Sequence, residues 1–533
     1  MQADLIFKGG PIYTSATGTA EAIAVAGDKV VAAGTEAAVL NLAGPGTRVH
    51  HLEGRTLLPG LVDAHLHVLG YGIGLRQVLL ADVPDLGAAI ARIGERAAAT
   101  PRGEWVLGRG FVEDKWAVKR LPTRDDLDRV SPHHPVLITR ACGHIAVANT
   151  AALRLAAVTG ATPDPQGGQI DRDSHGEPTG VLREKAIGLV GEVVPELTYS
   201  EKRDALLAAV TDAASRGITD LHSDDVRQAG TFADSWRLWN EVAGPEAFPM
   251  RGYLLMYHEA YEEFRSFGLK RGDGNAYVRQ GMIKLFADGS LGGHTAALLA
   301  PYADDPATKG LYIHKEADFM AMVARYHRDG YQICCHCIGD GAIQLFLDAI
   351  EAANRQHPRP DHRHRMIHAQ CNSPALMQRM RQLKVVGDIQ PKFIHSDGYF
   401  YQERLGSERA RWFNPWKTMI EMGIPCCGGS DCPVEPLHMP WQLHAAVARQ
   451  DLNGRPADGW NPAERLSMPQ TIAIHTEGAA YAAFEEGIKG KLAPGMLADL
   501  VVLDRDPYHT PPADLQDLKV HLTMVGGRVA FER

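Results

Sequence analysis

Eight apolar runs, most of them ending in polar residues, recur along the chain. Continuous apolar runs of this length are typical of strands that are buried on both faces, as in parallel sheets. Segments with helical periodicity, such as 340–356, lie between several of them. The runs are 56–67, 216–225, 250–258, 281–289, 331–340, 365–371, 385–391 and 424–433. Eight such strands alternating with helices predict an α/β protein built on a (β/α)₈ TIM barrel.

The two ends of the chain follow a different pattern. Short β-type runs broken by glycine and proline turns occupy 4–34 at one end and 489–532 at the other. Neither end is long enough to close a core of its own. We therefore expect residues 1–56 and 485–533 to build one small β-sandwich, and the barrel to take residues 57–75 and 206–484.

The first two barrel strands are unusually far apart. A single crossover between parallel strands needs far fewer residues than the stretch that separates His67 from His222. This stretch predicts an inserted α+β domain over residues 76–205, which we expect to cover the active site.

Composition narrows the class of protein. The chain has 533 residues with 45% apolar and 22% charged residues, as in ordinary globular proteins. The formal charge of −9 and the lack of basic runs argue against a nucleic-acid partner. No apolar run is long enough to span a membrane, and no secretory leader is evident. Eight cysteines without a disulfide spacing favour reduced thiols in the cytoplasm. We expect a small-molecule substrate, with a homodimer left open as the assembly.

Polar residues at the ends of the apolar runs are the candidate chemistry, because the active sites of such barrels lie at the carboxyl ends of the strands. His65 and His67 are two residues apart, so on a strand they share one face. His336, His368 and Asp431 each follow a separate apolar run. A lone histidine at a strand end is more often a hydrogen-bonded structural group than a ligand. Four histidines and an aspartate at four strand ends together predict a divalent metal centre, with Zn²⁺ the expected ion.

These motifs resemble the amidohydrolase superfamily, and more closely its amidohydrolase-3 branch of YtcJ-like metal-dependent hydrolases, which includes N-substituted formamide deformylases. The resemblance covers nearly the whole chain. It is carried by LPGLVDAHLH, KLFADGSLGGHTA, HCIGDGAI, RHRMIHAQ and GGSDCPVEP at the strand ends, RACGHIAVANTAAL in the insertion, and KGKLAPGMLADLVVLD near the carboxyl end.

The resemblance implies a role for each metal residue. His65 and His67 would hold one ion, completed by Asp431. His336 and His368 would hold a second ion, and Lys284 would bridge the two as a carbamate formed with CO₂. The alternative is that Lys284 pairs with an acid such as Asp288, in which case one ion is expected rather than two.

The expected activity is hydrolysis of a C–N bond in an amide, formamide or cyclic amide. A metal-activated hydroxide would attack the carbonyl group, and Asp431 would carry the proton to the leaving nitrogen. Hydrolysis of esters, lactones or phosphotriesters on the same centre stays open. The least favoured alternative is a metal-binding protein without catalysis.

Four further residues are candidate substrate contacts. His144 lies in the inserted-domain motif, where Asn149 is more simply interpreted as a helix cap. Trp116 is either a pocket wall or part of loop packing. His294 stands where relatives often have arginine, and His395 lies two residues beyond a position where many relatives have histidine. These departures predict a substrate that differs from those of the relatives.

Overall fold

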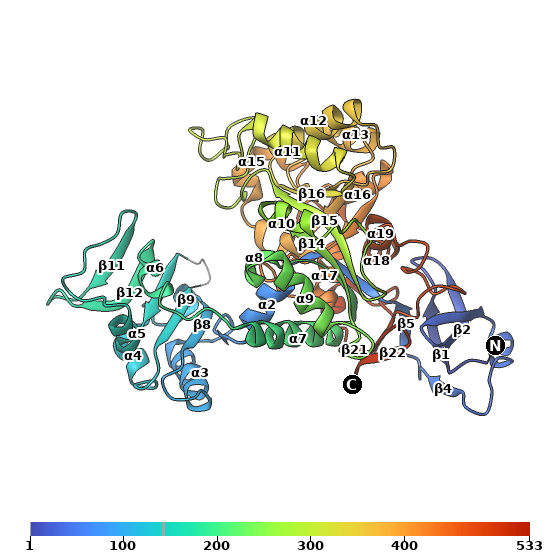
Figure 1. The fold of residues 1–533 in the computed structure, drawn as a ribbon, viewed down its shortest axis with the longest axis horizontal. Coiled ribbons are helices and arrows are strands. Elements are labelled where there is room, and N and C mark those ends of the chain that lie inside the picture. The colour runs from blue at the N-terminus through green and yellow to red at the C-terminus, as the bar shows by residue number, and fades with distance from the viewer. Residues whose placement is uncertain (1, 141–143) are drawn as a thin grey trace. The chain divides into compact units, whose positions relative to one another are not determined.

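The computed structural model describes residues 2–140 and 144–533, and within these residues the chain divides into two compact units (Figure 1). One unit comprises Met1–Tyr71 and Leu206–Arg533, and the other comprises Gly72–Ala205. The chain passes between them within two helices, α2 (Val68–Leu75) and α7 (Tyr199–Ser215).

The large unit contains an eight-stranded, wholly parallel sheet in the order β19-β18-β17-β16-β15-β14-β13-β6. Its strands are β6 (Leu61–Leu66), β13 (Ile218–Asp224), β14 (Arg251–Tyr257), β15 (Val278–Phe286), β16 (Ile333–Cys337), β17 (Arg365–His368), β18 (Val386–Ile389) and β19 (Cys426–Gly428). The loop after β19 meets β6 through two backbone hydrogen bonds, from Asp431 N to His65 O at 2.7 Å and from His67 N to Cys432 O at 2.7 Å. These bonds bring the two edge strands together, and the predicted barrel is confirmed.

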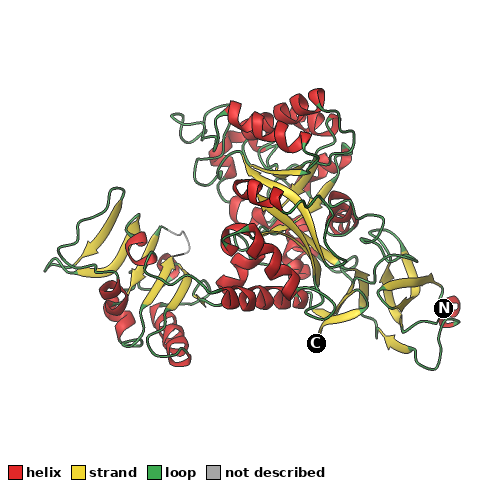
Figure 2. Cartoon of the chain, in the orientation of Figure 1, coloured by secondary structure: helices red, strands yellow, loops and turns green. Residues whose placement is uncertain are grey.

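Helices surround the strands, as Figure 2 shows. They are α8 (Val226–Ala229), α9 (Phe232–Val242), α10 (Tyr261–Ser266), α11 (Glu316–Arg328), α12 (Asp340–Gln356), α13 (Pro374–Gln382), α14 (Ile394–Asp397), α15 (Tyr401–Ala410), α16 (Trp416–Glu421), α17 (Met439–Ala448), α18 (Met468–Ile474) and α19 (Glu477–Ala482). In α12 the buried Ile343, Phe346, Leu347 and Ile350 recur at helical spacing and join the main core. This periodicity is why the segment was predictable as a helix.

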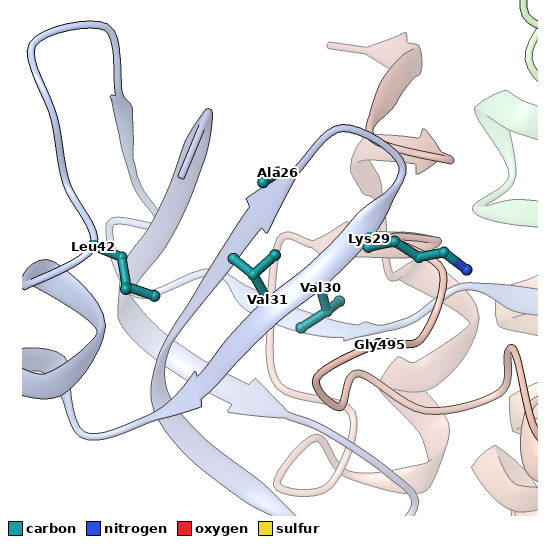
Figure 3. Close-up of a pocket in the computed structure, with 6 residues that line it drawn as sticks. All are labelled: Ala26, Lys29, Val30, Val31, Leu42 and Gly495. Carbon is teal, nitrogen blue, oxygen red and sulfur yellow. The ribbon is translucent and has the colours of Figure 1, made fainter. Parts of the chain in front are cut away.

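Strands from both ends of the chain share one mostly antiparallel sheet, ordered β22-β21-β20-β5-β1-β2-β3, with β4 also paired to β1. The strands are β1 (Leu5–Tyr13), β2 (Thr19–Ala26), β3 (Lys29–Gly34), β4 (Arg48–His51), β5 (Thr56–Pro59), β20 (Leu500–Leu503), β21 (Val520–Val525) and β22 (Arg528–Glu532), and α1 (Glu36–Leu40) follows β3. The apolar run 56–67 is thus two strands, β5 in this sheet and β6 in the barrel. Gly60 separates them, where a side-chain carbon would lie 2.4 Å from Thr219 Oγ1. A shallow apolar pocket lies beside this β2–β3 hairpin (Figure 3).

The smaller unit is built on a six-stranded mixed sheet, ordered β11-β12-β10-β9-β8-β7. Its elements are β7 (Val78–Leu79), α3 (Leu86–Ala99), β8 (Val106–Phe111), α4 (Arg124–Asp128), β9 (Val136–Arg140), β10 (Ile145–Ala148), α5 (Thr150–Leu155), β11 (Gly168–Arg172), β12 (Pro178–Glu184) and α6 (Ile187–Gly191). Asn149 caps α5, since its side chain accepts from Ala152 N at 3.0 Å.

In the described part of the chain, no helix is both apolar enough and long enough to cross a membrane.

Three buried histidines form a cluster where β16 and β17 begin. The Ile333 N–H donates to His364 Nδ1 at 3.0 Å, so the His364 proton is on Nε2, which lies 2.8 Å from His327 Nδ1. His362 Nδ1 accepts from His364 N at 3.0 Å. Burial lowers the pKa of His362 to about 4, and repulsion between protonated His362 and protonated His327 acts in the same direction. Each ring is therefore held as a neutral acceptor.

This cluster is expected to make the fold sensitive to acid. The pKa of His362 in the folded protein lies below its unfolded value of about 6.5. Neutral His362 therefore contributes fully to the free energy of unfolding above about pH 6.5, and this contribution is lost as the pH falls towards 4. Between about pH 7.5 and about pH 5, wild type should lose about 2 kcal/mol more unfolding free energy than His362→Asn loses. The asparagine amide oxygen can still accept the hydrogen bond, but the side chain cannot become charged. Urea unfolding at the two pH values measures this difference. The exposed His175, changed to Asn, is the control, and equal pH dependence in His362→Asn and wild type would contradict the assignment.

Candidate metal centre

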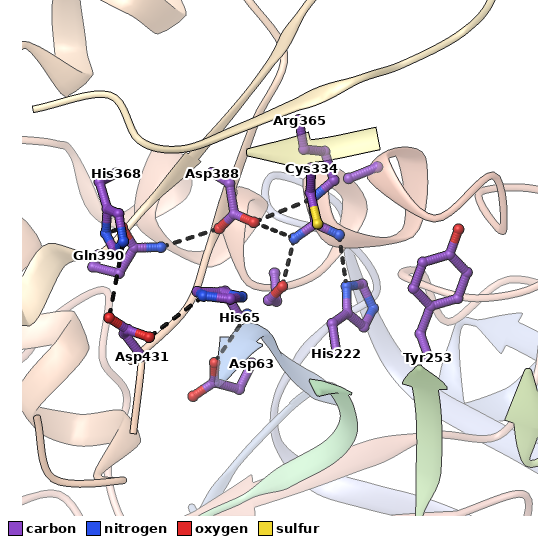
Figure 4. A network of polar contacts seen from close by, with 12 residues as sticks. Asp63, His65, His222, Tyr253, Cys334, Arg365, His368, Asp388, Gln390 and Asp431 are labelled. Atoms are coloured by element: carbon purple, nitrogen blue, oxygen red, sulfur yellow. Dashed lines mark hydrogen bonds and ion pairs between the residues drawn. The ribbon is translucent and has the colours of Figure 1, made fainter. Parts of the chain in front are cut away.

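Three imidazole rings and one carboxylate converge at the carboxyl end of the barrel, and Figure 4 shows two of the rings, those of His65 and His368, beside Asp431. His65 Nε2 lies 3.4 Å and His67 Nε2 lies 3.2 Å from Asp431 Oδ1, and His368 Nε2 lies 3.9 Å from Asp431 Oδ2. His65 is in β6 with His67 just after it, His368 ends β17, and Asp431 follows β19. The closing hydrogen bond from Asp431 N to His65 O sets the carboxylate beside the two histidines of β6. The predicted i, i+2 pair therefore faces one point.

Hydrogen bonds on the opposite side of two rings fix how they face Asp431. His67 Nδ1 lies 3.1 Å from the Asp224 carbonyl oxygen, and His368 Nδ1 lies 2.8 Å from Gln390 Oε1. Both partners are oxygens that accept, so Nδ1 carries the proton in each ring. In a neutral ring this leaves the Nε2 lone pair available, which is the arrangement that metal-binding histidines use.

The charge states of these groups suit a cation. Burial and the nearby Lys284 hold the pKa of His65 well below its usual value, and burial and His336 do the same for His368. Burial alone would raise the pKa of Asp431, but hydrogen bonds with His65 and His67 hold it well below its usual range. Burial alone would lower the pKa of His67, but its hydrogen bond with Asp431 outweighs burial and raises that pKa to about 8. The centre thus offers two neutral imidazoles and an ionised carboxylate, and His67 must release a proton to bind a metal.

The donor set fits one divalent ion. Ligand atoms of His65, His67 and Asp431 all lie within 4.8 Å of one another, and the three residues are buried or nearly so. Two imidazole nitrogens and a carboxylate oxygen are ligands that Zn²⁺ accepts in catalytic sites, where a further position stays open.

Lys284 and His336 lie beside these ligands but make other contacts. Lys284 is fully buried, and its Nζ lies 3.0 Å from His65 Nε2. The Asp288 carboxylate instead accepts from the backbone N–H groups of 297, 338 and 339, and no ion pair joins it to Lys284 among the described residues. His336 Nε2 lies 2.9 Å from the Gly289 carbonyl oxygen, although its ring centroid is 4.5 Å from that of His368.

Comparison with known proteins identifies the family. The model of the Amidohydrolase family matches residues 48–531 of the chain. The chain belongs to the amidohydrolase family. A Bacillus subtilis protein named "Putative amidohydrolase YtcJ" is 36% identical over 92% of this amidohydrolase and 91% of its own length. N-substituted formamide deformylase of Arthrobacter pascens is 28% identical over 96% of the chain and 95% of its own length.

A solved structure agrees with this assignment. An uncharacterized metal-dependent hydrolase from Pyrococcus furiosus is 28% identical, with a TM-score of 0.77 over 95% of this chain and 99% of its own. The amidohydrolase is accordingly a metal-dependent hydrolase of the class that acts on C–N bonds, on the TIM barrel that the strand pattern predicted.

The structure of the amidohydrolase adds one acid that the sequence reasoning missed. The predicted run 216–225 ends in two acids, and in the structure β13 continues to the first of them, Asp224, which pairs with Leu255. Asp224 is 3% exposed, and its Oδ1 has no hydrogen-bond partner among the described residues. Burial raises its pKa, which the charges of His67 and Lys284 oppose. The adjacent acidic pair, Asp224 and Asp225, was the available clue.

The four candidate substrate contacts of the amidohydrolase each have different surroundings. His144 is mostly exposed and pairs with Glu184 at 2.9 Å, in a motif whose residues 141–143 lie outside the described part. Trp116 is 2% exposed, packs in the core of the smaller unit and donates to Val83 O at 3.2 Å. These contacts favour loop packing over a pocket wall. His294 pairs with Asp304 at 3.1 Å. His395 follows β18, and neither of its ring nitrogens has a hydrogen-bond partner among the described residues.

Proposed function

We propose that this amidohydrolase cleaves the C–N bond of a small amide, formamide or cyclic amide at the centre formed by His65, His67, His368 and Asp431. The observation that supports the proposal is the convergence of three Nε2 atoms on one carboxylate at the barrel mouth. The similarity to an N-substituted formamide deformylase makes formamides the first substrates to test.

The residues of the centre would have two roles, metal binding and proton transfer. His65, His67, His368 and Asp431 would hold a divalent ion, with Zn²⁺ the expected one, and the bound ion would supply a Lewis acid that lowers the pKa of water towards neutrality. Asp431 is an ionised carboxylate at the centre, so one of its oxygens can accept the proton of the attacking water. The same proton can then pass to the leaving nitrogen, which departs as the amine.

The number of ions depends on Lys284. We favour one ion, because His336 Nε2 is hydrogen-bonded to Gly289 O and Lys284 Nζ lies against His65. Two ions would require Lys284 Nζ to lose a proton and form an N–C bond to CO₂, which would give a bridging carbamate. A metal count per chain decides between these arrangements.

The test is a substrate panel on purified protein with its metal counted. We expect at least one bound divalent ion per chain and faster turnover of N-substituted formamides and amides than of esters, lactones or phosphotriesters with the same substituent. Protein that carries no metal and binds none would overturn the metal-dependent proposal. Preference for an oxygen ester would leave the centre in place but replace the C–N bond as its target.

A further inference from the structure

A buried polar chain runs from the metal centre into the barrel interior (Figure 4). His368 Nδ1 lies 2.8 Å from Gln390 Oε1, and Gln390 Nε2 donates to Asp388 Oδ1 at 3.2 Å. Gln390 is 3% exposed and Asp388 is fully buried. Few other groups can therefore compete for these hydrogen bonds, and the arrangement of each depends on the next.

The carboxylate of Asp388 determines which end of the Gln390 amide faces His368. An ionised carboxylate only accepts, so it attracts the NH₂ end of the amide and leaves Oε1 pointing at His368. Because Oε1 also only accepts, the proton of His368 must be on Nδ1. The Nε2 lone pair then faces Asp431, at 3.9 Å. A reversed amide would put an NH₂ group against Nδ1 and move the proton to Nε2, where it would block metal binding.

Arg365 holds Asp388 in place and also contacts the first barrel strand. Its Nε donates to Asp388 Oδ2 at 3.1 Å, and its Nη1 lies 3.0 Å from His222 Nδ1. Its Nη2 donates to the carbonyl oxygen of Ala64, the residue before His65. One fully buried guanidinium thus positions both the strand of His65 and the carboxylate that orients Gln390.

We propose that Arg365, Asp388 and Gln390 are positioning residues that hold His368 in its Nδ1–H form and thereby set the affinity of the centre for a divalent metal. The inference rests on the proposed metal centre. It adds that three residues without contact to the ion control the orientation of a ligand, through amide orientation and proton position rather than through charge at the centre.

The first test compares Gln390→Met with Gln280→Met. Both glutamines are nearly fully buried, Gln280 in β15 and Gln390 just after β18. The Gln280 side chain donates to Leu254 O and, among the described residues, has no hydrogen bond to a residue of the centre. We expect the Zn²⁺ dissociation constant, measured by competition with a chromophoric chelator, to rise about 10- to 100-fold in Gln390→Met and to stay at the wild-type value in Gln280→Met. The thermal midpoints of the two metal-free variants should fall by similar amounts. An unchanged constant in Gln390→Met would overturn the inference.

A second measurement reads the position of the proton directly in wild type. Nitrogen-15 NMR of histidine-labelled, metal-free wild type should show His368 protonated at Nδ1, with the signal assigned by its loss in His368→Gln. Protonation at Nε2 would overturn the inference. Wild type that binds no Zn²⁺ would defeat the proposed function itself, whereas tight wild-type binding with an unaffected Gln390→Met would defeat only the positioning role.

Discussion

Changing Asp431 to Asn is expected to lower kcat/KM for amide hydrolysis by about 10³-fold or more. Asparagine has nearly the same shape, but it cannot accept the proton of the attacking water and is a weaker metal ligand. His65 Nε2 and His67 Nε2, at 3.4 Å and 3.2 Å from the carboxylate, would lose their anionic partner. Steady-state kinetics on the best substrate of the panel, with metal counted in the same preparation, measures the effect.

Two comparisons make this result specific. Asp348→Asn, on the outer helix α12, removes a carboxylate that pairs with Arg379 away from the centre and should leave kcat/KM unchanged. Wild type stripped by a chelator should lose its activity and recover it with Zn²⁺, whereas stripped Asp431→Asn should stay inactive after Zn²⁺ is added. An Asp431→Asn enzyme that keeps a tenth of the wild-type kcat/KM would remove Asp431 from the mechanism.

The sequence was sufficient to predict the parts of the centre that follow from strand geometry. His65 and His67 alternate on one strand, so their shared face follows from the two-residue period. His368 ends a buried strand and Asp431 follows another, and parallel strands of a barrel bring such ends together. The family resemblance supplied the grouping of His65, His67 and Asp431 around one ion, and it placed His368 with His336 on a second.

The remaining features depend on contacts between distant segments, which local patterns do not encode. Asp431 N reaches His65 O only because the sheet closes, and the register of β13 carries Asp224 two residues beyond His222. His336 has the same strand-end pattern as His368, but the nearby Gly289 carbonyl engages its Nε2. Periodicity likewise gave no indication that Gln390 lies against His368, since this contact is set by Asp388 and Arg365 in the interior.

Changing Asp499 to Asn is expected to destabilise the large unit by about 3–5 kcal/mol. Asp499, just before β20 of the terminal sheet, receives two bonds from Arg251 at the start of β14, at 2.7 Å and 2.8 Å. Both residues are more than nine-tenths buried. The neutral amide would leave the Arg251 charge in the interior without a partner, and that desolvated charge is the source of the cost. Chemical unfolding followed by tryptophan fluorescence measures the change in unfolding free energy.

A double variant separates the cost of an unpaired charge from the loss of a favourable contact. Arg251→Met combined with Asp499→Asn removes both charges, while the amide oxygen can still accept from Gly526 N, which lies 2.8 Å from Asp499 Oδ1. Because no unpaired charge is left in the interior, the double variant should be more stable than Asp499→Asn alone. The exposed pair of Lys417 and Glu421 is the comparison, and Glu421→Gln should leave the unfolding free energy nearly unchanged. If Asp499→Asn costs no more than Glu421→Gln, water reaches Arg251, and the junction between the terminal sheet and the barrel is not held by a desolvated ion pair.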